Sequence, residues 1–264
     1  MNTLLDLSAS FDTIDHAMLC RRLKEHFGID GMALAWFRSY LAERSYSVAI
    51  NGILSDEFPL EHGVPQGSVL GPRLFSLYVT PLASVIDIFD VDHHCYADDT
   101  QLRKEAHISN LSPMVKTVEN CCVSVKSWMC KNGLKLNDAK TEVLICSSAS
   151  NVKRIELPCV QIGDAKVNAT THARNLGVIL DDRLSMVKEI NNRVKIMNFE
   201  LRRIAKMKKF LSYKSLKTVV SSLILSRLDY CSSLFLGLPK VLINKLQRVQ
   251  NNAIRLVLGK NNIR

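Results

Sequence analysis

The string Tyr96-Ala97-Asp98-Asp99 holds the side chains best suited to chemistry in this sequence. Two adjacent carboxylates repel each other unless a cation lies beside them, and a tight hairpin would fix their separation. Hard divalent cations prefer such oxygen ligands, so the pair indicates a metal site. The same four residues are also typical of a surface turn rich in Asp, so this string alone does not decide between the two.

A third carboxylate strengthens the metal interpretation. Asp6 interrupts the apolar run Leu4-Leu5-Asp6-Leu7, where a buried carboxylate is costly unless it is paired or bound to a metal. Two-metal phosphoryl transfer uses carboxylates from different segments around ions roughly 3.5–4 Å apart. Asp6, Asp98 and Asp99 supply this set if their strands are neighbours. Asp12 and Asp15 are competing candidates, although both are typical of the start of a helix.

The hydrophobic pattern before residue 182 mixes helices with short strands, which predicts an α+β fold. Asp12-Thr13 is expected to cap a helix that ends at Gly28, and a second helix follows Asp30. Asn51-Gly52 predicts a hairpin. A second hairpin, with the two aspartates at its tip, is expected around residues 94–102. Pro81 should end or kink the helix that begins after Pro72, and Ser112-Pro113 should open a long helix. Further strands are expected at 134–137, 143–146, 155–162 and 176–180.

The charge of the chain is unevenly distributed. Its 264 residues are 47% hydrophobic and 23% charged, which excludes an intrinsically disordered chain, and the formal net charge is +10. Residues 183–264 hold 18 Lys and Arg against 3 Asp and Glu, whereas residues 1–182 hold 17 against 22. Helical patterns at 184–209, 212–236 and 239–258 fill the basic part. A nucleic-acid partner is favoured over a membrane surface, with a solvated basic face as the alternative.

No signal peptide or membrane-spanning run is recognised, and the eight cysteines show no CxxC pair. These features predict reduced thiols without a disulfide partner, no membrane association, and an intracellular protein of the cytoplasm or nucleus.

Five segments, in order, resemble the motifs of reverse transcriptases from non-LTR retrotransposons, with jockey-like elements of animals as the closest similarity. Residues 5–16, which begin Leu5-Asp6-Leu7, resemble motif A. Residues 63–72, from Gly63 to Pro72, resemble motif B, and Tyr96-Ala97-Asp98-Asp99 resembles motif C. Motif D is matched by residues 133–137 with Lys140-Thr141-Glu142, and motif E by residues 175–180.

This resemblance implies a polymerase palm, an antiparallel sheet with packed helices, over residues 1–182. An all-helical, thumb-like basic region follows over residues 183–264. Because motif A starts at the fifth residue, the resemblance also implies an N-terminally truncated chain with the fingers absent, for which little or no polymerase activity is expected.

The resemblance assigns roles to individual positions. Asp6 and Asp98 would bind two Mg²⁺ ions, with Mn²⁺ as an alternative, and Asp99 would support them. Lys140 would protonate the pyrophosphate leaving group, a task that suits a side chain protonated at neutral pH. A solvated surface lysine is the alternative for Lys140.

Other positions would contact the substrates, which are a deoxynucleoside triphosphate, an RNA template and a DNA primer. Phe11 would act as an aromatic gate against a ribose 2′-hydroxyl, or else belong to the core. Gln66 and Gly67 would lie against the incoming nucleotide and template, although Gln66 could instead bond within its own loop. Leu176 and Gly177 would form part of the primer grip. The duplex phosphates would be bound by the basic helices, at Arg202, Arg203, Lys206, Lys208, Lys209, Lys245 and Arg248.

Two classes of function therefore follow from the sequence. The first is an RNA-directed DNA polymerase, a nucleotidyltransferase with a two-metal mechanism. The second is a catalytically inactive remnant that binds nucleic acid without turnover. An unrelated basic α+β protein is the third interpretation, and it would require Asp6 and Asp98 to lie apart.

Overall fold

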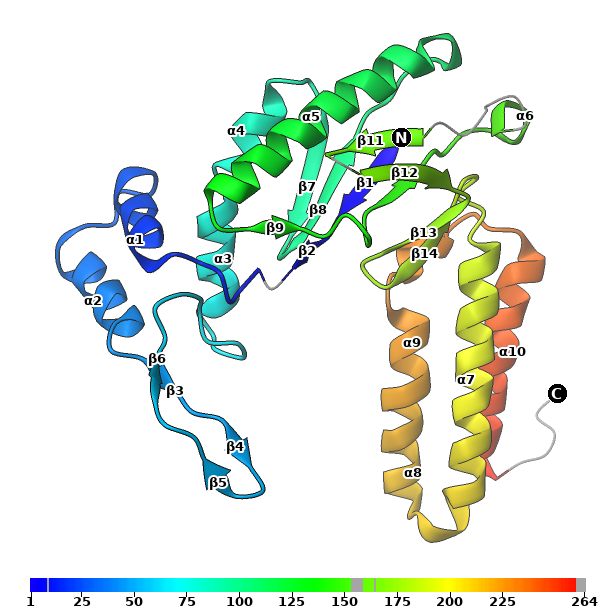
Figure 1. The fold of residues 1–264 in the computed structure, drawn as a ribbon. Coiled ribbons are helices and arrows are strands. Elements are labelled where there is room, and N and C mark those ends of the chain that lie inside the picture. The colour runs from blue at the N-terminus through cyan, green and yellow to red at the C-terminus, as the bar shows by residue number, and fades with distance from the viewer. Residues whose placement is uncertain (9, 153–158, 164, 260–264) are drawn as a thin grey trace. The chain divides into compact units, whose positions relative to one another are not determined.

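The computed structural model describes residues 1–8, 10–152, 159–163 and 165–259 (Figure 1). Two compact units are formed. The first consists of Met1–Ile145 with Lys153–Thr170, and the second of Cys146–Val152 with Thr171–Arg264. Ala9 of the motif A segment and residues 155–158 of one expected strand lie outside the described residues.

A six-stranded sheet forms the centre of the first unit, in the order β11-β12-β10-β1-β8-β7. Strand β1 (Asn2–Leu5) lies between β10 (Glu142–Leu144) and β8 (Asp99–Arg103), antiparallel to both. The other strands are β7 (Asp92–Tyr96), β11 (Cys159–Ile162) and β12 (Ala165–Thr170).

The sheet is mixed, which corrects the expectation of an antiparallel sheet. Strand β12 pairs parallel to β10 and antiparallel to β11. Because β11 comes between β10 and β12 in the chain and occupies the outer edge, the chain runs through β12 in the same direction as through β10.

Capping residues and prolines determine where the helices of the first unit begin and end. Helix α1 (His16–Glu25) is capped by Asp15 rather than by Asp12-Thr13, because the Asp15 carboxylate accepts a bond from the Met18 N–H at 2.6 Å. Helix α2 (Gly31–Leu41) is capped by Asp30, as predicted. Pro81 separates α3 (Gly71–Val79) from α4 (Leu82–Asp87), also as predicted. A 3₁₀ turn (Ile108–Asn110) leads into α5 (Leu111–Lys131).

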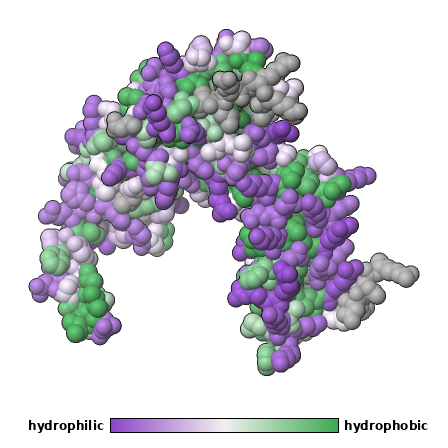
Figure 2. All heavy atoms as spheres, turned by 45° about the vertical axis from the view of Figure 1, so that its right-hand side comes forward, coloured by the Kyte–Doolittle hydropathy of each residue, from purple (hydrophilic) through white to green (hydrophobic). Residues whose placement is uncertain are grey.

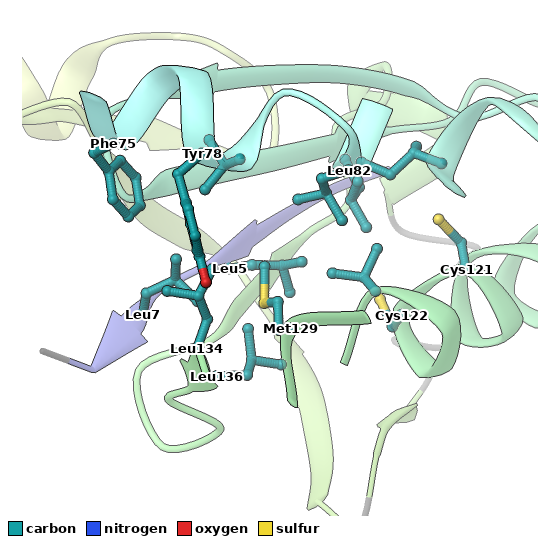
Figure 3. Packing of buried hydrophobic residues seen from close by; sticks show 14 of the residues in the cluster. Leu5, Leu7, Phe75, Tyr78, Leu82, Cys121, Cys122, Met129, Leu134 and Leu136 are labelled. Carbon is teal, nitrogen blue, oxygen red and sulfur yellow. The ribbon is translucent and has the colours of Figure 1, made fainter. Parts of the chain in front are cut away.

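The core of this unit lies between β1 and the helices α3, α4 and α5. Figure 3 shows Leu5 of β1 facing Tyr78, Leu82 and Met129. All four side chains are almost completely buried. Burial of this apolar surface stabilises the unit and holds the end of β1, where Asp6 follows, in a fixed place.

Four strands of two residues each follow α2 and form a long hairpin. Strand β3 (Ser45–Tyr46) pairs with β6 (Phe58–Pro59), and β4 (Ala49–Ile50) pairs with β5 (Ile53–Leu54). Asn51-Gly52 forms the predicted turn, both residues having a positive φ. The hairpin exposes a group of apolar side chains (Figure 2), namely Val48, Ile50, Ile53 and Leu54.

The second unit combines the hairpin β13 (His172–Asn175) and β14 (Val178–Asp181) with a helical bundle. Its long helices, α7 (Val187–Met207) and α10 (Lys240–Leu258), pack on each other. The expected helix at 212–236 is divided into α8 (Tyr213–Val220), a π turn (Ser221–Leu225), α9 (Ser226–Asp229) and a 3₁₀ turn (Ser232–Phe235). A short helix, α6 (Ala149–Val152), and a 3₁₀ turn (Lys208–Phe210) complete the unit.

Packing groups the hairpin of residues 172–181 with these helices. The functional boundary at residue 182 stays a prediction. Each helix in the described part of the chain is too short or too polar for a membrane-spanning segment.

Candidate active site

The three candidate aspartates come together at one end of the central strands. Leu5 of β1 pairs with Thr100 of β8, so Asp6 lies beside Asp99. Tyr96 pairs with Asp99 across the β7–β8 hairpin, which leaves Asp98 in a two-residue turn. Ala97, in the left-handed region at φ +52°, makes this tight turn. The predicted hairpin with the aspartates at its tip is therefore confirmed.

The electrostatics of this cluster favour a cation. Burial raises the pKa of the Asp99 carboxyl, and the negative charges of Asp98 and Asp6 raise it further. Asp6 is half-buried, and its Oδ2 atom is buried and accepts no hydrogen bond that meets the geometric criteria; its nearest cation is the exposed Lys140 ammonium, at 3.4 Å. A buried carboxylate oxygen with this single exposed cation, next to two more carboxylates, is chemically suited to a divalent metal ion.

The side chains do not form a complete cage of protein ligands. Within the described residues, no three His, Cys, Asp or Glu side chains are grouped closely enough to hold a metal ion. Mg²⁺ in phosphoryl-transfer sites is usually bound by one or two carboxylates together with substrate phosphates, so a cage of three is not required. The donor set fits such an ion, although it does not select Mg²⁺ over Mn²⁺.

Lys140 lies next to Asp6. Its ammonium Nζ is 3.4 Å from Asp6 Oδ2, and its side chain is 69% exposed. The turn that carries Lys140 is fixed to Asp6, since the Asn137 N–H donates to the Asp6 carbonyl at 2.8 Å and the Lys140 N–H donates to the Asn137 carbonyl. Strand β9 (Lys135–Leu136) pairs with β2 (Leu7–Ser8) directly before this turn. The motif D lysine is thus both accessible to solvent and held at the carboxylate cluster.

The motif B loop is bonded to the segment that follows Asp6. The Gly63 N–H donates to the Ile14 carbonyl at 2.8 Å, and the Val64 N–H donates to the Phe11 carbonyl at 2.9 Å. Gly63 has φ +87°, and a Cβ there would lie 2.9 Å from the Asp12 Cα and carbonyl oxygen. Glycine is required because only it tolerates both this conformation and this close approach.

Gly63→Ala is expected to destabilise the first unit by about 2–4 kcal/mol, through backbone strain and overlap with Asp12. Gly67→Ala is the matched control, because Gly67 has φ +79° but open space around it, so about 1 kcal/mol is expected. Urea denaturation of the three proteins measures the difference. Equal losses in the two variants would show that the approach to Asp12 does not matter.

The substrate-contact candidates are found around this loop. Phe11 is half-buried and its ring centroid lies 4.8 Å from that of Phe75, so it belongs to the edge of the core. Gln66 is exposed and donates to the Asp12 carboxylate at 2.9 Å. Gly67 is exposed as well. The roles of all three in substrate binding stay predictions.

Asp99→Asn is expected to stabilise the first unit at pH 7. Since the pKa of Asp99 is raised in the fold, its protonated form is favoured there, and stability is lost as the pH rises through the folded value. Asn carries no charge, so it avoids this loss. The difference should shrink towards pH 3.5, below the ordinary Asp value of about 3.9. Thermal melts at both pH values test this expectation, and a less stable variant at pH 7 would contradict it.

In the second unit, Leu176 and Gly177 form the turn between β13 and β14, both with positive φ. Tyr230 donates from its hydroxyl to the Leu176 carbonyl at 2.6 Å. Glu189 accepts from the Ile179 N–H at 3.0 Å. The turn assigned to the primer grip is therefore held by side chains of the helical bundle.

A buried ion pair supports this arrangement. Glu189 and Arg193 are 5% and 7% exposed, and Arg193 Nη2 lies 2.7 Å from Glu189 Oε1. Arg193 also donates to the carbonyls of Arg227 and Tyr230, at 2.8 and 2.7 Å. Sequence reasoning missed this pair because its spacing of four residues is also typical of an exposed helical pair.

The basic residues of the bundle that were selected from the sequence differ in their contacts and in their exposure. Arg203 is bonded to Glu200, and Lys245 donates to Asn191. Arg202 lines a hollow with Lys195, which the sequence analysis did not select. The remaining candidates, Lys206, Lys208, Lys209 and Arg248, are exposed or half-exposed.

The family of the chain follows from its match to a family model. Residues 1–180 match the model described as reverse transcriptase (RNA-dependent DNA polymerase), which covers all five motif segments. The chain belongs to the reverse transcriptase family. The resemblance read from the motifs is thereby confirmed.

Curated relatives of this reverse transcriptase chain come from mobile elements of Drosophila melanogaster. It is 23% identical over 271 residues to the RNA-directed DNA polymerase from mobile element jockey. It is 25% identical over 262 residues to the probable RNA-directed DNA polymerase from transposon X-element. These alignments cover 98% and 97% of the chain but only 28% of each relative.

Among solved structures, the chain is similar to apo telomerase from Candida tropicalis, at 15% identity and a TM-score of 0.47. That match covers 68% of this chain and 33% of the other, and is too weak to carry an argument.

Proposed function

We propose that this reverse transcriptase chain carries the nucleotidyl-transfer site of an RNA-directed DNA polymerase. One observation carries the proposal: the Leu5–Thr100 pairing sets the motif A aspartate, Asp6, beside Asp98 and Asp99 of motif C. Membership of the reverse transcriptase family supports the same assignment. The third interpretation, an unrelated basic α+β protein, required Asp6 and Asp98 to lie apart and is therefore not supported.

In the proposed mechanism, Asp6 and Asp98 would hold two divalent cations, with Mg²⁺ as the expected ion and Mn²⁺ as a substitute. When bound, such ions lower the proton affinity of the primer 3′-hydroxyl and offset the charge of the reacting phosphates. Asp99 adds negative charge behind this pair, and the hydrogen bond of Asn137 to the Asp6 carbonyl fixes the backbone of the first ligand.

The neighbouring residues orient the substrates and move a proton. Lys140 is exposed and 3.4 Å from Asp6, so its ammonium can reach a leaving pyrophosphate and donate a proton to it. Phe11 excludes a 2′-hydroxyl by its bulk. Gln66 and Gly67 line the path of the nucleotide and the template base.

In the second unit, the Leu176-Gly177 turn would hold the primer end, and the basic helices would neutralise duplex phosphates. The proposed partners of this unit are accordingly a DNA primer and an RNA template.

The test is template-directed extension of a DNA primer on an RNA template with all four deoxynucleotides and Mg²⁺. In place of the little or no activity that the resemblance implied, we expect a product that is complementary to the template and that disappears when the metal is chelated. Binding of the primer–template without any extension would favour the second class of function, a protein that binds nucleic acid without turnover.

A further inference from the structure

A hollow between α1 and α2 has no role in the mechanism above. It has a volume of about 450 Å³ and is lined by one face of α1, at His16, Ala17 and Arg21, and by Arg38 and Leu41 of α2. Lys24 lies at its rim, one helical turn after Arg21. We call this hollow the α1–α2 pocket. All of its lining residues belong to the first unit.

The α1–α2 pocket is strongly cationic. Its lining includes Arg21, Lys24 and Arg38 and contains no carboxylate. Lys24 is paired with Asp30 at 3.5 Å. In the described part of the chain, no carboxylate oxygen lies within 4.0 Å of a guanidinium nitrogen of Arg21 or Arg38. Arg38 interacts with the Asp30 carboxylate only at longer range, and Asp30 is shared with Lys24. Within the described residues, the two guanidinium groups therefore line one hollow without a direct ion pair.

The Cys20 thiol of α1, which also lines the pocket, does not remove this charge. Arg38 interacts with the Cys20 thiol, but burial is the main influence on that thiol and raises its pKa. A neutral thiol leaves the charge of Arg38 available. Guanidinium groups recognise phosphate through paired, charge-assisted hydrogen bonds, so the chemistry of the pocket selects a phosphate-bearing ligand.

The position of the α1–α2 pocket indicates which phosphates reach it. His16, which lines the pocket, forms a hydrogen bond of 2.6 Å between its Nε2 and the Gly63 carbonyl. Gly63 begins the motif B loop, which carries Gln66 and Gly67. This loop lies in the connection between β6 and α3 (Figure 1). The pocket and the start of this loop are therefore in direct contact through His16. A concave site also favours a single strand, whose backbone bends easily, over a stiff duplex.

We propose that the α1–α2 pocket binds the phosphodiester backbone of the single-stranded RNA template, through Arg21 and Arg38. This inference rests on the proposed function for the identity of the strand. It adds a contact outside the aspartate cluster, with the exposed Ala17 as an apolar surface against which a ribose can pack.

The test measures binding of a fluorescent 20-nucleotide single-stranded RNA by anisotropy, in EDTA, so that catalysis plays no part. The double variant Arg21→Gln/Arg38→Gln is expected to bind roughly tenfold more weakly. The slope of the logarithm of the binding constant against the logarithm of the salt concentration should become shallower by about 1.4, or about 0.7 for each lost phosphate contact. Arg21→Lys/Arg38→Lys, which keeps the charge but loses the paired geometry, should fall in between.

Lys116→Gln/Lys131→Gln is the matched control, because it removes the same charge from exposed positions on α5 of the same unit. Its RNA affinity should fall less than twofold. Equal losses in the two glutamine variants would overturn the proposal, and so would displacement of the RNA by millimolar inorganic phosphate or a free deoxynucleotide. Primer extension is measured in a separate assay with Mg²⁺, so a failure of the polymerase assignment would be seen there and not in this binding assay.

Discussion

Asp98→Asn is expected to reduce extension of a DNA primer on an RNA template about a thousandfold. The substitution keeps the size of the side chain and removes the charge that holds a divalent cation. Loss of several kcal/mol of transition-state stabilisation corresponds to a factor of this size. Asp6→Asn should have a similar effect, since Asp6 and the motif C aspartates lie side by side across β1 and β8. Single-turnover incorporation of one nucleotide measures both.

Asp92→Asn provides the control for this experiment. Asp92 lies on the same β7–β8 hairpin, is 70% exposed and pairs with Arg103 at 3.4 Å. Its loss should change incorporation less than twofold. The carboxylate assignment would be contradicted if Asp98→Asn retained wild-type incorporation, or if Asp12→Asn lost as much as Asp98→Asn, because Asp12 would then be the ligand.

Arg193→Met is expected to destabilise the second unit by about 3–5 kcal/mol. The change leaves the Glu189 carboxylate, only 5% exposed, without its cation in a dry environment. It also removes the donors to the carbonyls of Arg227 and Tyr230, which fix the segment whose Tyr230 hydroxyl bonds to Leu176. Chemical denaturation followed by circular dichroism should show the loss.

Arg203→Met is the matched control on the same helix. Arg203 is 64% exposed and pairs with Glu200 at 3.3 Å, so solvent screens the pair and about 0–1 kcal/mol is expected. A loss at Arg193 as small as that at Arg203 would show that the buried pair does not hold the bundle together.

The local elements could be predicted because they depend on nearby residues. Asp30 caps α2, Pro81 separates α3 from α4, and Asn51-Gly52 closes a hairpin. Each of these is a contact or a backbone preference within a few positions. The first cap was misplaced, because Asp12 and Asp15 are equally suitable by type. The choice of Asp15 depends on the bonds that Gly63 and Val64 make to the segment before it.

Contacts between segments that are distant in the sequence were harder to predict. Asp6 was expected to lie near Asp99 only if their strands were neighbours. The sequence of one strand does not show which distant strand it pairs with. The parallel pairing of β10 and β12 was missed for the same reason.

Counts of charged residues also predicted only some of the cationic sites. They marked the basic helices but not the pocket of Arg21 and Arg38, because the first part of the chain is acidic overall. Nor could a count show that Glu189 and Arg193 are buried together, since burial depends on how α7 packs in the bundle.

The central claim is that Asp6 and Asp98, supported by Asp99, hold the cations on which nucleotidyl transfer depends. The most direct measurement is electron paramagnetic resonance of Mn²⁺, whose free-ion signal weakens on binding, with an RNA template, a terminated DNA primer and a matching deoxynucleotide present. We predict that the wild-type chain binds two Mn²⁺ ions and that Asp98→Asn binds at most one. The same number of bound ions in both proteins would contradict the account.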